Sequence, residues 1–453
     1  MNIIVVGAGK IGVTVIARLV AEGHDVIAID SDPNVIQQIS NVYDVMCVCG
    51  NGVDWETLTE AGVKNTELLL AVTGSDEFNM LCCFMAKQLG APHTIARIRN
   101  PEYNDKSLSF IKQTLGLSFS INPDAMAAKE LFNLLQLPGA ESIETFARRS
   151  FEMVEIILKP DSKLNGLTLM EMKKRFPAPY LVGTVQREND SYIPDGSFRL
   201  QIGDRIGLSA AANQIEGILK MLGSKQSRSK NVMIIGASRC AFYLTKMLLN
   251  SGVSVTVIDK DKAACEAFSE LVPSAIVCLG DAADEAFLLE EGLETMDAFV
   301  SLTGIDQENI LISHLAASRG VKKVITKINR EEFSAIATKL GLDCIISPRQ
   351  LIADIVTRYA RALDNSKGSQ METLYSLMNG SAEALEFKVL EDFPYVNITL
   401  KDMKLKKNTL IAGIIRDKKV IIPGGNDVIL PGDSIVVLTS GDRLGELAEM
   451  MES

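Results

Sequence analysis

The sequence is poor in the residues from which catalytic and metal centres are most often built. It contains three histidines in 453 residues, at positions 24, 93 and 314, and none of them lies near another in the sequence. Its eight cysteines form no Cys-x-x-Cys pair and no disulfide-rich framework, which indicates a reducing compartment. Neither a zinc site nor a histidine-based catalytic centre is therefore expected.

Long apolar runs and an excess of positive charge are also missing. No apolar run reaches the ~18 residues that a membrane-spanning helix needs, and no basic segment with a cleavage site precedes the first apolar run, so no signal peptide is expected. The 46 Lys and Arg residues stand against 57 Asp and Glu residues, and the net charge of −11 argues against nucleic acid as the main partner. These absences predict a globular protein of the cytoplasm.

The chain contains an internal repeat. The apolar run and glycine turn at 2–9 reappear at 231–238, and the segment 73–79 reappears at 303–309. Because further matches follow in the same order, the sequence indicates a tandem duplication.

Each half begins with β-branched runs that alternate with stretches of helical periodicity, the pattern of βαβ units around a parallel sheet. The first half predicts strands near 2–6, 25–29, 45–49, 68–72 and 94–98, with helices near 10–22, 33–40, 54–61 and 77–89. A shorter second part predicts strands at 151–158, 180–186 and 205–209 and helices near 168–175 and 211–222.

The expected fold is therefore α/β, with two Rossmann-like, doubly wound parallel-sheet domains that are each followed by a small α+β domain. Polar linkers are expected at 223–230 and 362–370. The expected domains are 1–138, 139–222, 231–365 and 371–453.

A glycine-rich turn follows the first expected strand. Gly7-Ala8-Gly9-Lys10-Ile11-Gly12 has the GxGxxG spacing of a dinucleotide-binding loop, placed between a strand and a helix as that motif requires. Gly7 permits the tight turn, Gly9 has no Cβ to block a pyrophosphate, and Gly12 allows close packing of helix and sheet. The amide groups at the helix start would face the phosphates.

An acidic residue closes the second expected strand. The Asp30 carboxylate would accept hydrogen bonds from the adenosine ribose. No arginine follows in Ser31-Asp32-Pro33 to bind a 2′-phosphate, so the sequence favours NAD over NADP.

The second copy of the loop is altered to Gly236-Ala237-Ser238-Arg239-Cys240-Ala241. Its first glycine and Asp259 are retained, but Ser238 places a side chain where a pyrophosphate would approach. Two interpretations stay open: a working second nucleotide site, or a loop that is kept only for folding.

Further candidate ligand contacts lie at the ends of the later strands, at the edge where open α/β sheets bind ligands. Thr73-Gly74 and Thr303-Gly304 follow the fourth strand of each copy, and Arg97 and Lys327 end the fifth. Asp76 and Asn79 are as well explained by helix capping as by ligand binding. No histidine occurs in the small domains, so the acid or base that hydride transfer commonly needs is not evident.

The sequence resembles the RCK (KTN) domains, which regulate potassium channels and transporters. The resemblance rests on GAGKIG with Asp30, VTGSDEFN at 72–79 and RIRNPEY at 97–103, followed by a module with Pro-x-Gly and Gly-Asp turns similar to the RCK C-terminal domain. It covers essentially the whole chain, twice in the order N–C–N–C. It implies a non-catalytic cytosolic regulator that binds NAD(H) and adenine nucleotides such as ATP and ADP. Its partner would be a membrane potassium transporter subunit of the TrkH or TrkG type.

The resemblance also implies the contact residues and the assembly. The implied nucleotide contacts are Gly7, Ala8, Gly9, Lys10, Ile11, Asp30, Thr73, Gly74 and Arg97, and in the second half Gly236, Ala237, Ser238, Arg239, Cys240, Asp259, Thr303, Gly304 and Lys327. Helices near 125–137 and 351–363 would cross over between paired domains, the alternative being that each packs on its own sheet. The family's rings of eight Rossmann domains imply a homotetramer, with the crossover helices as the expected interface.

Two other functions compete with a regulator of potassium uptake. An NAD-dependent oxidoreductase would turn over nicotinamide substrates, whereas a metabolite-binding transcription or signalling module would need a DNA-binding element. The sequence contains no helix-turn-helix and no basic patch that would support the second of these.

Overall fold

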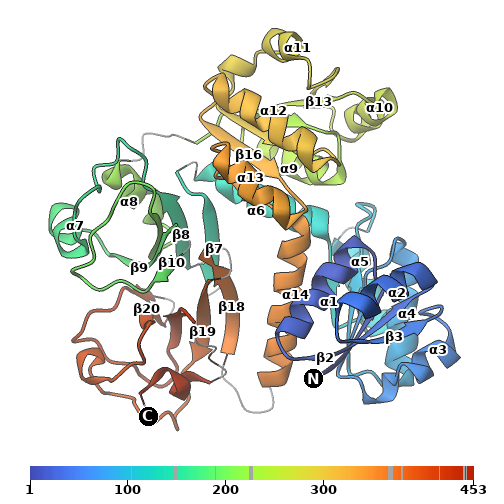
Figure 1. Ribbon diagram of the computed structural model, residues 1–453, viewed down its shortest axis with the longest axis horizontal. Helices are drawn as coiled ribbons and strands as arrows, with labels where there is room; N and C mark the ends of the chain where they lie inside the picture. Colours follow the sequence, from blue (N-terminus) through green and yellow to red (C-terminus); the bar gives the residue numbers. More distant parts are fainter. Residues whose placement is uncertain are drawn as a thin grey trace.

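The computed structural model describes residues 1–452 except 104, 138, 147–149, 189, 224–227, 366–370, 379–380, 418, 442–443 and 445. Two Rossmann domains lie beside a stacked pair of small domains, and the long helix α14 (Pro348–Asn365) runs between them (Figure 1). The α/β fold class predicted from the sequence is confirmed. Of the two expected linkers, residues 224–227 and 366–370 lie outside the described residues.

The first Rossmann domain contains a six-stranded parallel sheet in the order β3-β2-β1-β4-β5-β6. Its strands are β1 (Asn2–Val6), β2 (Asp25–Asp30), β3 (Met46–Cys49), β4 (Leu68–Ala71), β5 (His93–Arg97) and β6 (Phe119–Ile121). Its helices are α1 (Lys10–Ala21), α2 (Pro33–Val42), α3 (Trp55–Glu60), α4 (Asp76–Leu89) and α5 (Asp105–Leu115). The strand order reverses between β1 and β4, which opens a crevice at the carboxyl ends of these strands.

The second Rossmann domain repeats this sheet in the order β14-β13-β12-β15-β16-β17. Its strands are β12 (Asn231–Ile235), β13 (Ser254–Asp259), β14 (Ile276–Leu279), β15 (Ala298–Ser301), β16 (Lys323–Lys327) and β17 (Ile345–Ile346). Its helices are α9 (Arg239–Asn250), α10 (Lys262–Leu271), α11 (Glu285–Glu290), α12 (Asp306–Ser318) and α13 (Glu331–Lys339). In both domains the central strands are buried on both faces, as their largely apolar runs predict.

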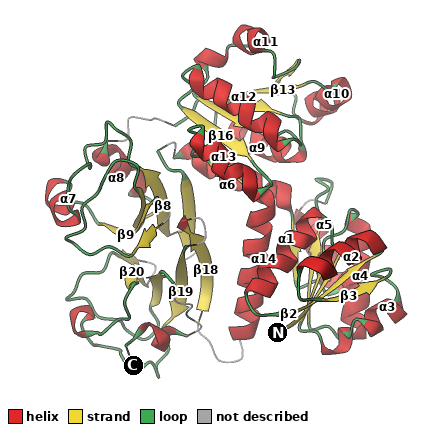
Figure 2. Cartoon of the chain, viewed as in Figure 1, coloured by secondary structure: helices red, strands yellow, loops and turns green. Residues whose placement is uncertain are grey.

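Each small domain is an antiparallel sheet with little helix around it (Figure 2). The first contains β7 (Ser142–Phe146), β8 (Phe151–Ile157), β9 (Tyr180–Arg187), β10 (Asp190–Tyr192), β11 (Arg205–Ala211), α7 (Leu169–Arg175) and α8 (Ile215–Leu222). The second contains β18 (Met371–Leu377), β19 (Ala382–Lys388), β20 (Thr409–Arg416), β21 (Lys419–Ile421) and β22 (Ser434–Thr439). A single 3-10 turn at Leu400–Asp402 takes the place of α7 in the second copy.

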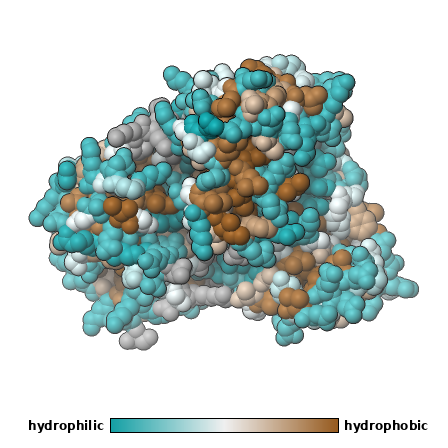
Figure 3. Space-filling view, turned by 45° about the horizontal axis from the view of Figure 1, so that its top comes forward, coloured by the Kyte–Doolittle hydropathy of each residue, from teal (hydrophilic) through white to brown (hydrophobic). Residues whose placement is uncertain are grey.

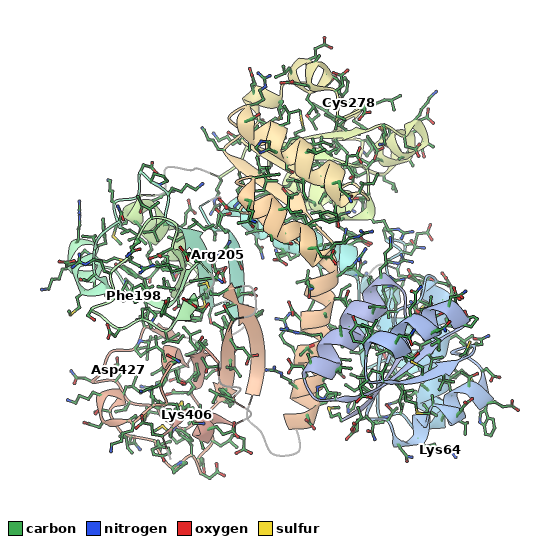
Figure 4. All side chains as sticks on the ribbon, in the orientation of Figure 1. Lys64, Phe198, Arg205, Cys278, Lys406 and Asp427 are labelled. Carbon is green, nitrogen blue, oxygen red and sulfur yellow. The ribbon has the colours of Figure 1, made fainter. Side chains whose placement is uncertain are left out.

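The two small domains pack against each other through one shared core. Phe151 and Met153 of the first domain join Leu438 of the second in one buried cluster. Glu155 connects the domains by a polar contact, since its Oε1 accepts a hydrogen bond from the Met378 amide at 2.9 Å. Its Oε2 lies 3.2 Å from Nη1 of Arg205, a residue of the same small domain that is labelled in Figure 4. The pair therefore forms one body within the chain.

The two halves exchange a helix. The apolar face of α6 (Pro123–Gln136), which includes Leu131 and Leu134, lies in one buried cluster with Val232 and Leu244 of the second Rossmann domain, where α6 contacts α9. Helix α14 makes the reciprocal contact: its apolar residues lie in the core of the first Rossmann domain and pack on α1. The crossover that the sequence left open is thus confirmed.

Polar contacts secure the same exchange. Arg361 near the end of α14 donates from Nε to the Glu22 carboxylate at 2.7 Å, and its guanidinium lies 3.2 Å from Glu383 of the second small domain. Lys323 at the start of β16 is almost fully buried and donates to the Ala140 carbonyl at 2.6 Å. Because these faces are covered within one chain, the expectation that another chain must cover the crossover helices is wrong.

A smaller side chain at a buried position of the exchanged helix α6 should destabilise the fold. Leu131 is fully buried, so Leu131→Ala should lower the free energy of unfolding by about 2–5 kcal/mol. Urea unfolding followed by circular dichroism measures this change. The matched control is Leu271→Ala at the end of α10, where the side chain is 61% exposed and the effect should stay within about 0.5 kcal/mol. Equal effects of the two substitutions would contradict the packing of α6 described here.

Candidate functional site

A cavity of about 870 Å³, called the larger cavity, lies at the carboxyl ends of the strands of the first parallel sheet. Its first wall comes from the first Rossmann domain and consists of the glycine loop, the end of β2 and the segments after β4 and β5. Its opposite wall comes from the second Rossmann domain and from the first turns of both exchanged helices. The lining residues that were predicted as nucleotide contacts are Gly7, Gly9, Lys10, Ile11, Asp30, Thr73, Gly74, Arg97, Ser238, Cys240 and Lys327.

The three glycines of the first loop meet different constraints. Gly7 has a φ of 91°, and a Cβ there would lie 2.8 Å from the Thr73 amide nitrogen. A Cβ on Gly12 would lie 2.0 Å from the Gly7 carbonyl oxygen, so both positions require glycine for the fold itself. A Cβ on Gly9 would meet no atom within 4 Å in the part of the chain that the structure describes. Gly9 lines the cavity at the start of α1, where no side chain caps the helix, so its free space is open to a ligand.

Asp30 holds the glycine loop in place as well as facing the cavity. Its Oδ2 accepts a hydrogen bond from the Ala8 amide at 2.7 Å, and its Oδ1 accepts one from the Asp32 amide at 3.0 Å. Ala8 is buried beneath the loop and does not line the cavity; its contribution is this amide. Each carboxylate oxygen keeps a further lone pair, so the carboxylate can still accept from a ribose.

The segment after β4 is fixed by a buried amide. Asn79 Oδ1 accepts from the Thr73 amide at 2.8 Å and from the Thr73 hydroxyl at 2.7 Å, while its Nδ2 donates to the Arg97 carbonyl at 2.9 Å. Asp76 Oδ2 accepts from the amides of Arg99 and Asn100. Neither side chain caps α4, because Ser75 accepts from the Phe78 amide and is the cap. Asp76 and Asn79 therefore join the ends of β4 and β5 and shape the cavity from behind.

Arg97 brings a positive charge into the cavity wall from a buried position. Only 8% of Arg97 is exposed, and its guanidinium donates to the Thr73 carbonyl. Its Nε is buried without a hydrogen-bond partner in the part of the chain that the structure describes. Burial, together with the neighbouring Arg99, lowers the pKa of Arg97 to about 10. A buried cation in this state is stabilised by an anion, and a phosphate group in the cavity would supply one.

The second half contains a smaller cavity of about 360 Å³ at the matching place. Asp259 repeats the contact of Asp30, since its Oδ2 accepts from the Ala237 amide at 2.7 Å. Asn309 likewise repeats the contacts of Asn79 with Thr303. The predicted contacts that line this cavity are Gly236, Ala237, Ser238, Asp259, Thr303 and Gly304.

Two features make the second cavity less suited to a pyrophosphate. The Ser238 hydroxyl accepts a hydrogen bond from the Ala241 amide at 3.3 Å, so the serine itself caps α9 at the place that Gly9 leaves open. The carboxylate of Glu308 lines the cavity where Phe78 lies in the first half, and it pairs with Lys260 at 3.1 Å. Because Lys260 also lines this cavity, its ion pair with Glu308 engages a cation that a phosphate would otherwise bind.

Three residues predicted as second-half contacts lie elsewhere. Cys240 and Lys327 line the larger cavity and not the smaller one, and Arg239 lines neither. Lys327 Nζ donates to the Leu302 carbonyl at 3.0 Å, and burial lowers its pKa. Burial raises the pKa of the Cys240 thiol to about 12, so this cysteine stays protonated. Cys240 and Lys327 were thus predicted as contacts of the wrong cavity, because a motif within one copy does not show which domain a strand end faces.

The sequence reasoning also passed over residues of the cavity wall. Arg99 and Asn329 follow β5 and β16, and Asp124 and Arg349 occupy the second position of the two exchanged helices. The signal that could have identified the last two was present, since an Asn-Pro and a Ser-Pro start the two crossover segments at matching places of the repeat. Among the described residues, no group of His, Cys, Asp and Glu could hold a metal ion, and no helix is long and apolar enough to cross a membrane.

Comparison with known proteins agrees with this architecture. The family model of the TrkA-N domain matches residues 3–116 and 232–348, and that of the TrkA-C domain matches residues 153–223 and 384–452. A protein of Archaeoglobus fulgidus named Trk system potassium uptake protein TrkA homolog is 31% identical over 99% of this chain and 100% of its own length. The Trk system potassium uptake protein TrkA of Haemophilus influenzae is 30% identical over 98% of this chain and 96% of its own.

A solved structure described as the GsuK channel bound to NAD has the same fold, with a TM-score of 0.63 at 16% identity over 97% of this chain and 77% of that one. Two TrkA-N domains and two TrkA-C domains follow each other in the present chain, and its relatives match it from end to end. The chain therefore belongs to the TrkA family.

Proposed function

We propose that the protein is a nucleotide-binding regulatory subunit of a potassium uptake system, held at the cytoplasmic face of the membrane by a transporter subunit of the TrkH or TrkG type. The observation that carries the proposal is the 870 Å³ cavity, which places a dinucleotide-type glycine loop from one Rossmann domain against a wall from the other. A ligand there touches two bodies at once. Its binding energy therefore depends on their relative position, which is the requirement for a ligand to shift a conformational equilibrium.

NAD(H) is the proposed ligand of the larger cavity, with ATP and ADP as further ligands. The open start of α1 at Gly9 suits a pyrophosphate, Asp30 suits the adenosine ribose, and Arg97 suits a phosphate oxygen. The name of the matched GsuK structure gives NAD as its ligand, which supports the same choice for this fold.

The alternative function for the same cavity is that of an oxidoreductase. Hydride transfer needs an acid or base beside the nicotinamide, and the cavity wall opposite the glycine loop offers mainly cations, with Asp124 as its carboxylate. Steady oxidation or reduction of nicotinamide with a broad substrate panel would refute the regulatory proposal.

Gly9→Val should abolish nucleotide binding while leaving the fold intact. A Cβ at Gly9 meets no atom of the described residues within 4 Å, so the added side chain has room in the protein and blocks only a ligand that approaches the start of α1. Calorimetric titration with NADH and ATP measures the loss, and circular dichroism confirms the fold. Full NADH affinity in Gly9→Val would contradict the larger cavity as the binding site.

Asp30→Ala should weaken NADH binding by about 1.5–3 kcal/mol, because one charge-assisted hydrogen bond would be lost. The same calorimetric titration measures this change.

The transport role is tested in the same variant. In cells that lack their own regulatory subunit, the intact protein should co-purify with a membrane potassium transporter and make potassium uptake depend on nucleotide. Gly9→Val should still co-purify, because the binding loop lies inside the cavity, but uptake should lose its nucleotide dependence. Absence of any transporter partner would contradict the proposal even where nucleotide binding is intact.

The second cavity should bind nucleotides more weakly, and Ser238→Gly should strengthen that binding. Removal of the serine frees the Ala241 amide, which its hydroxyl now occupies, and leaves the start of α9 open as α1 is. In the Gly9→Val background the added Ser238→Gly should restore measurable ATP or NADH binding. The control is Ser254→Gly on the same domain, which lies outside both cavities. Equal, tight binding of NADH by both cavities in the wild-type chain would contradict this asymmetry.

The expected homotetramer needs a surface other than the crossover helices. Large apolar side chains are exposed on α12, α13 and the turn before α12, namely Ile305 (51% exposed), Leu311 (68%) and Ile336 (49%). Apolar surface gathers on the upper Rossmann domain in the space-filling view (Figure 3). An exposed apolar patch of this kind is typical of a protein interface, so we assign the contact between chains to this face.

Leu311→Glu should therefore break the assembly into smaller species. Leu311 is the most exposed apolar side chain of this face, and a buried glutamate without a partner would oppose association. Light scattering at micromolar concentration measures the mass of wild type and variant. Val42→Glu on α2, where the side chain is 69% exposed, serves as the matched control and should keep the wild-type mass. A monomeric wild-type chain would count against the tetramer.

A further inference from the structure

The wall of the larger cavity concentrates charge from both halves. Arg97 and Arg99 reach it from the first Rossmann domain, Lys327 from the second, and Arg349 from the first turn of α14. The only carboxylate that faces these cations without another contact in the described part of the chain is Asp124, in the first turn of α6. The cavity is therefore rich in positive charge from both Rossmann domains.

The other carboxylates near this wall are already engaged. Asp76 accepts from the amides of Arg99 and Asn100 and lies 3.5 Å from the Arg99 guanidinium. Asp306 accepts from the amide of Asn329 and the amide of Arg330. Arg97 is nine-tenths buried, and its Nε has no partner among the described residues. The wall thus contains a buried donor that a ligand, and not the protein, is positioned to satisfy.

Asp124 is not required to cap its helix. The Asn122 side chain caps α6 by accepting from the Ala125 amide at 3.0 Å, and no hydrogen bond joins the Asp124 carboxylate to any residue that the structure describes. Burial raises the pKa of the Asp124 carboxyl above its ordinary value, against the opposing charges of Arg239 and Lys327 of the second half and Arg99 and Arg97 of the first. The carboxylate is the counter-charge of a cation cluster drawn from two domains.

The two copies of the repeat carry opposite charges at this position. The residue that matches Asp124 in the second exchanged helix is Arg349, since each follows the proline that starts its helix. One exchanged helix therefore brings a negative charge to the cavity and the other a positive one.

We propose that Asp124 lies where the terminal phosphate of a triphosphate would have to approach the cations, and that its carboxylate sets the selectivity between nucleotides with a short and a long phosphate chain. A phosphate chain that reaches Arg97 and Lys327 must share these cations with Asp124, so the carboxylate opposes the last phosphate of a triphosphate. An adenosine monophosphate, held near Gly9 and Asp30, ends before this point and is little affected. This inference rests on the proposed nucleotide binding and adds to it a residue that determines which nucleotide is preferred.

The test compares ATP with AMP, because the two share adenosine and differ only in the phosphate chain. Asp124→Asn removes the charge and keeps the shape of the side chain, so the affinity of the full-length protein for ATP should rise about tenfold, the change expected for one like charge at a few ångströms in a partly buried site. The affinity for AMP should change less than about twofold. Lys327→Gln should act in the opposite direction and weaken ATP about tenfold, although it belongs to the other half.

The control is Asp190→Asn, which makes the same charge change on an exposed residue of the first small domain and should alter neither affinity. Asp124→Ser provides a second variant should Asp124→Asn fail to fold. An unchanged ATP affinity in Asp124→Asn, or an equal rise for ATP and AMP, would overturn the assignment of Asp124 while leaving the proposed function in place. A wild-type protein that binds neither NADH nor ATP would instead overturn the proposed function itself.

Discussion

The exchange of α6 and α14 between the two Rossmann domains determines the rest of the arrangement. Each helix leaves its own domain and buries its apolar face on the other, with Leu131 in one core and Val356 in the other. Both helices start at the cavity, where Pro123 and Pro348 form part of its wall. The same contacts that stabilise the fold therefore bring the carboxyl ends of two parallel sheets face to face. The cavity at the edge of the first sheet therefore lies between two domains.

This geometry explains how a duplicated chain can have two unequal sites. The fold constrains Gly7 and Asp30 through backbone contacts, and their counterparts Gly236 and Asp259 keep the same roles in the second half. Gly9 is under no such constraint from the protein, and its counterpart is Ser238, which caps the helix instead. Residues that serve the fold are thus retained in both copies, whereas the residue that leaves room for a ligand differs.

Much of the fold was predictable because it depends on local patterns. The apolar runs predicted β1, β2 and β4 to within one residue, and helical periodicity predicted α1 and α4 equally well. The short strand β6 and the edge strands β7 and β10 were missed, since three to five residues carry too little pattern to separate them from a loop. Helix α5 was missed for a related reason, because only part of it packs on the sheet and its Phe110 is 69% exposed.

Only the wall of the candidate site that contains the glycine motif could be predicted from the sequence. GxGxxG and Asp30 have a fixed spacing, so the glycine loop and the carboxylate beside it could be placed from the sequence alone. The opposite wall could not, since Lys327, Asp124 and Arg349 meet the loop through the helix exchange, a long-range contact that no local pattern encodes. The exchange also explains why the apolar faces of α6 and α14 suggested a contact between chains: their cover comes from residues distant in sequence but within the same chain.

The most direct test of the account is hydrogen–deuterium exchange of the full-length protein with and without ATP, analysed by mass spectrometry. A nucleotide held between the domains should slow exchange of amides in the first half around Gly7–Gly12 and Thr73–Asp76, and also in the second half around Lys327–Arg330 and Arg349–Ile352. Both sets should return to the rates of the free protein in the presence of ATP when Gly9 is replaced. Slower exchange confined to the first-half segments would contradict the central claim that the ligand bridges the two Rossmann domains of one chain.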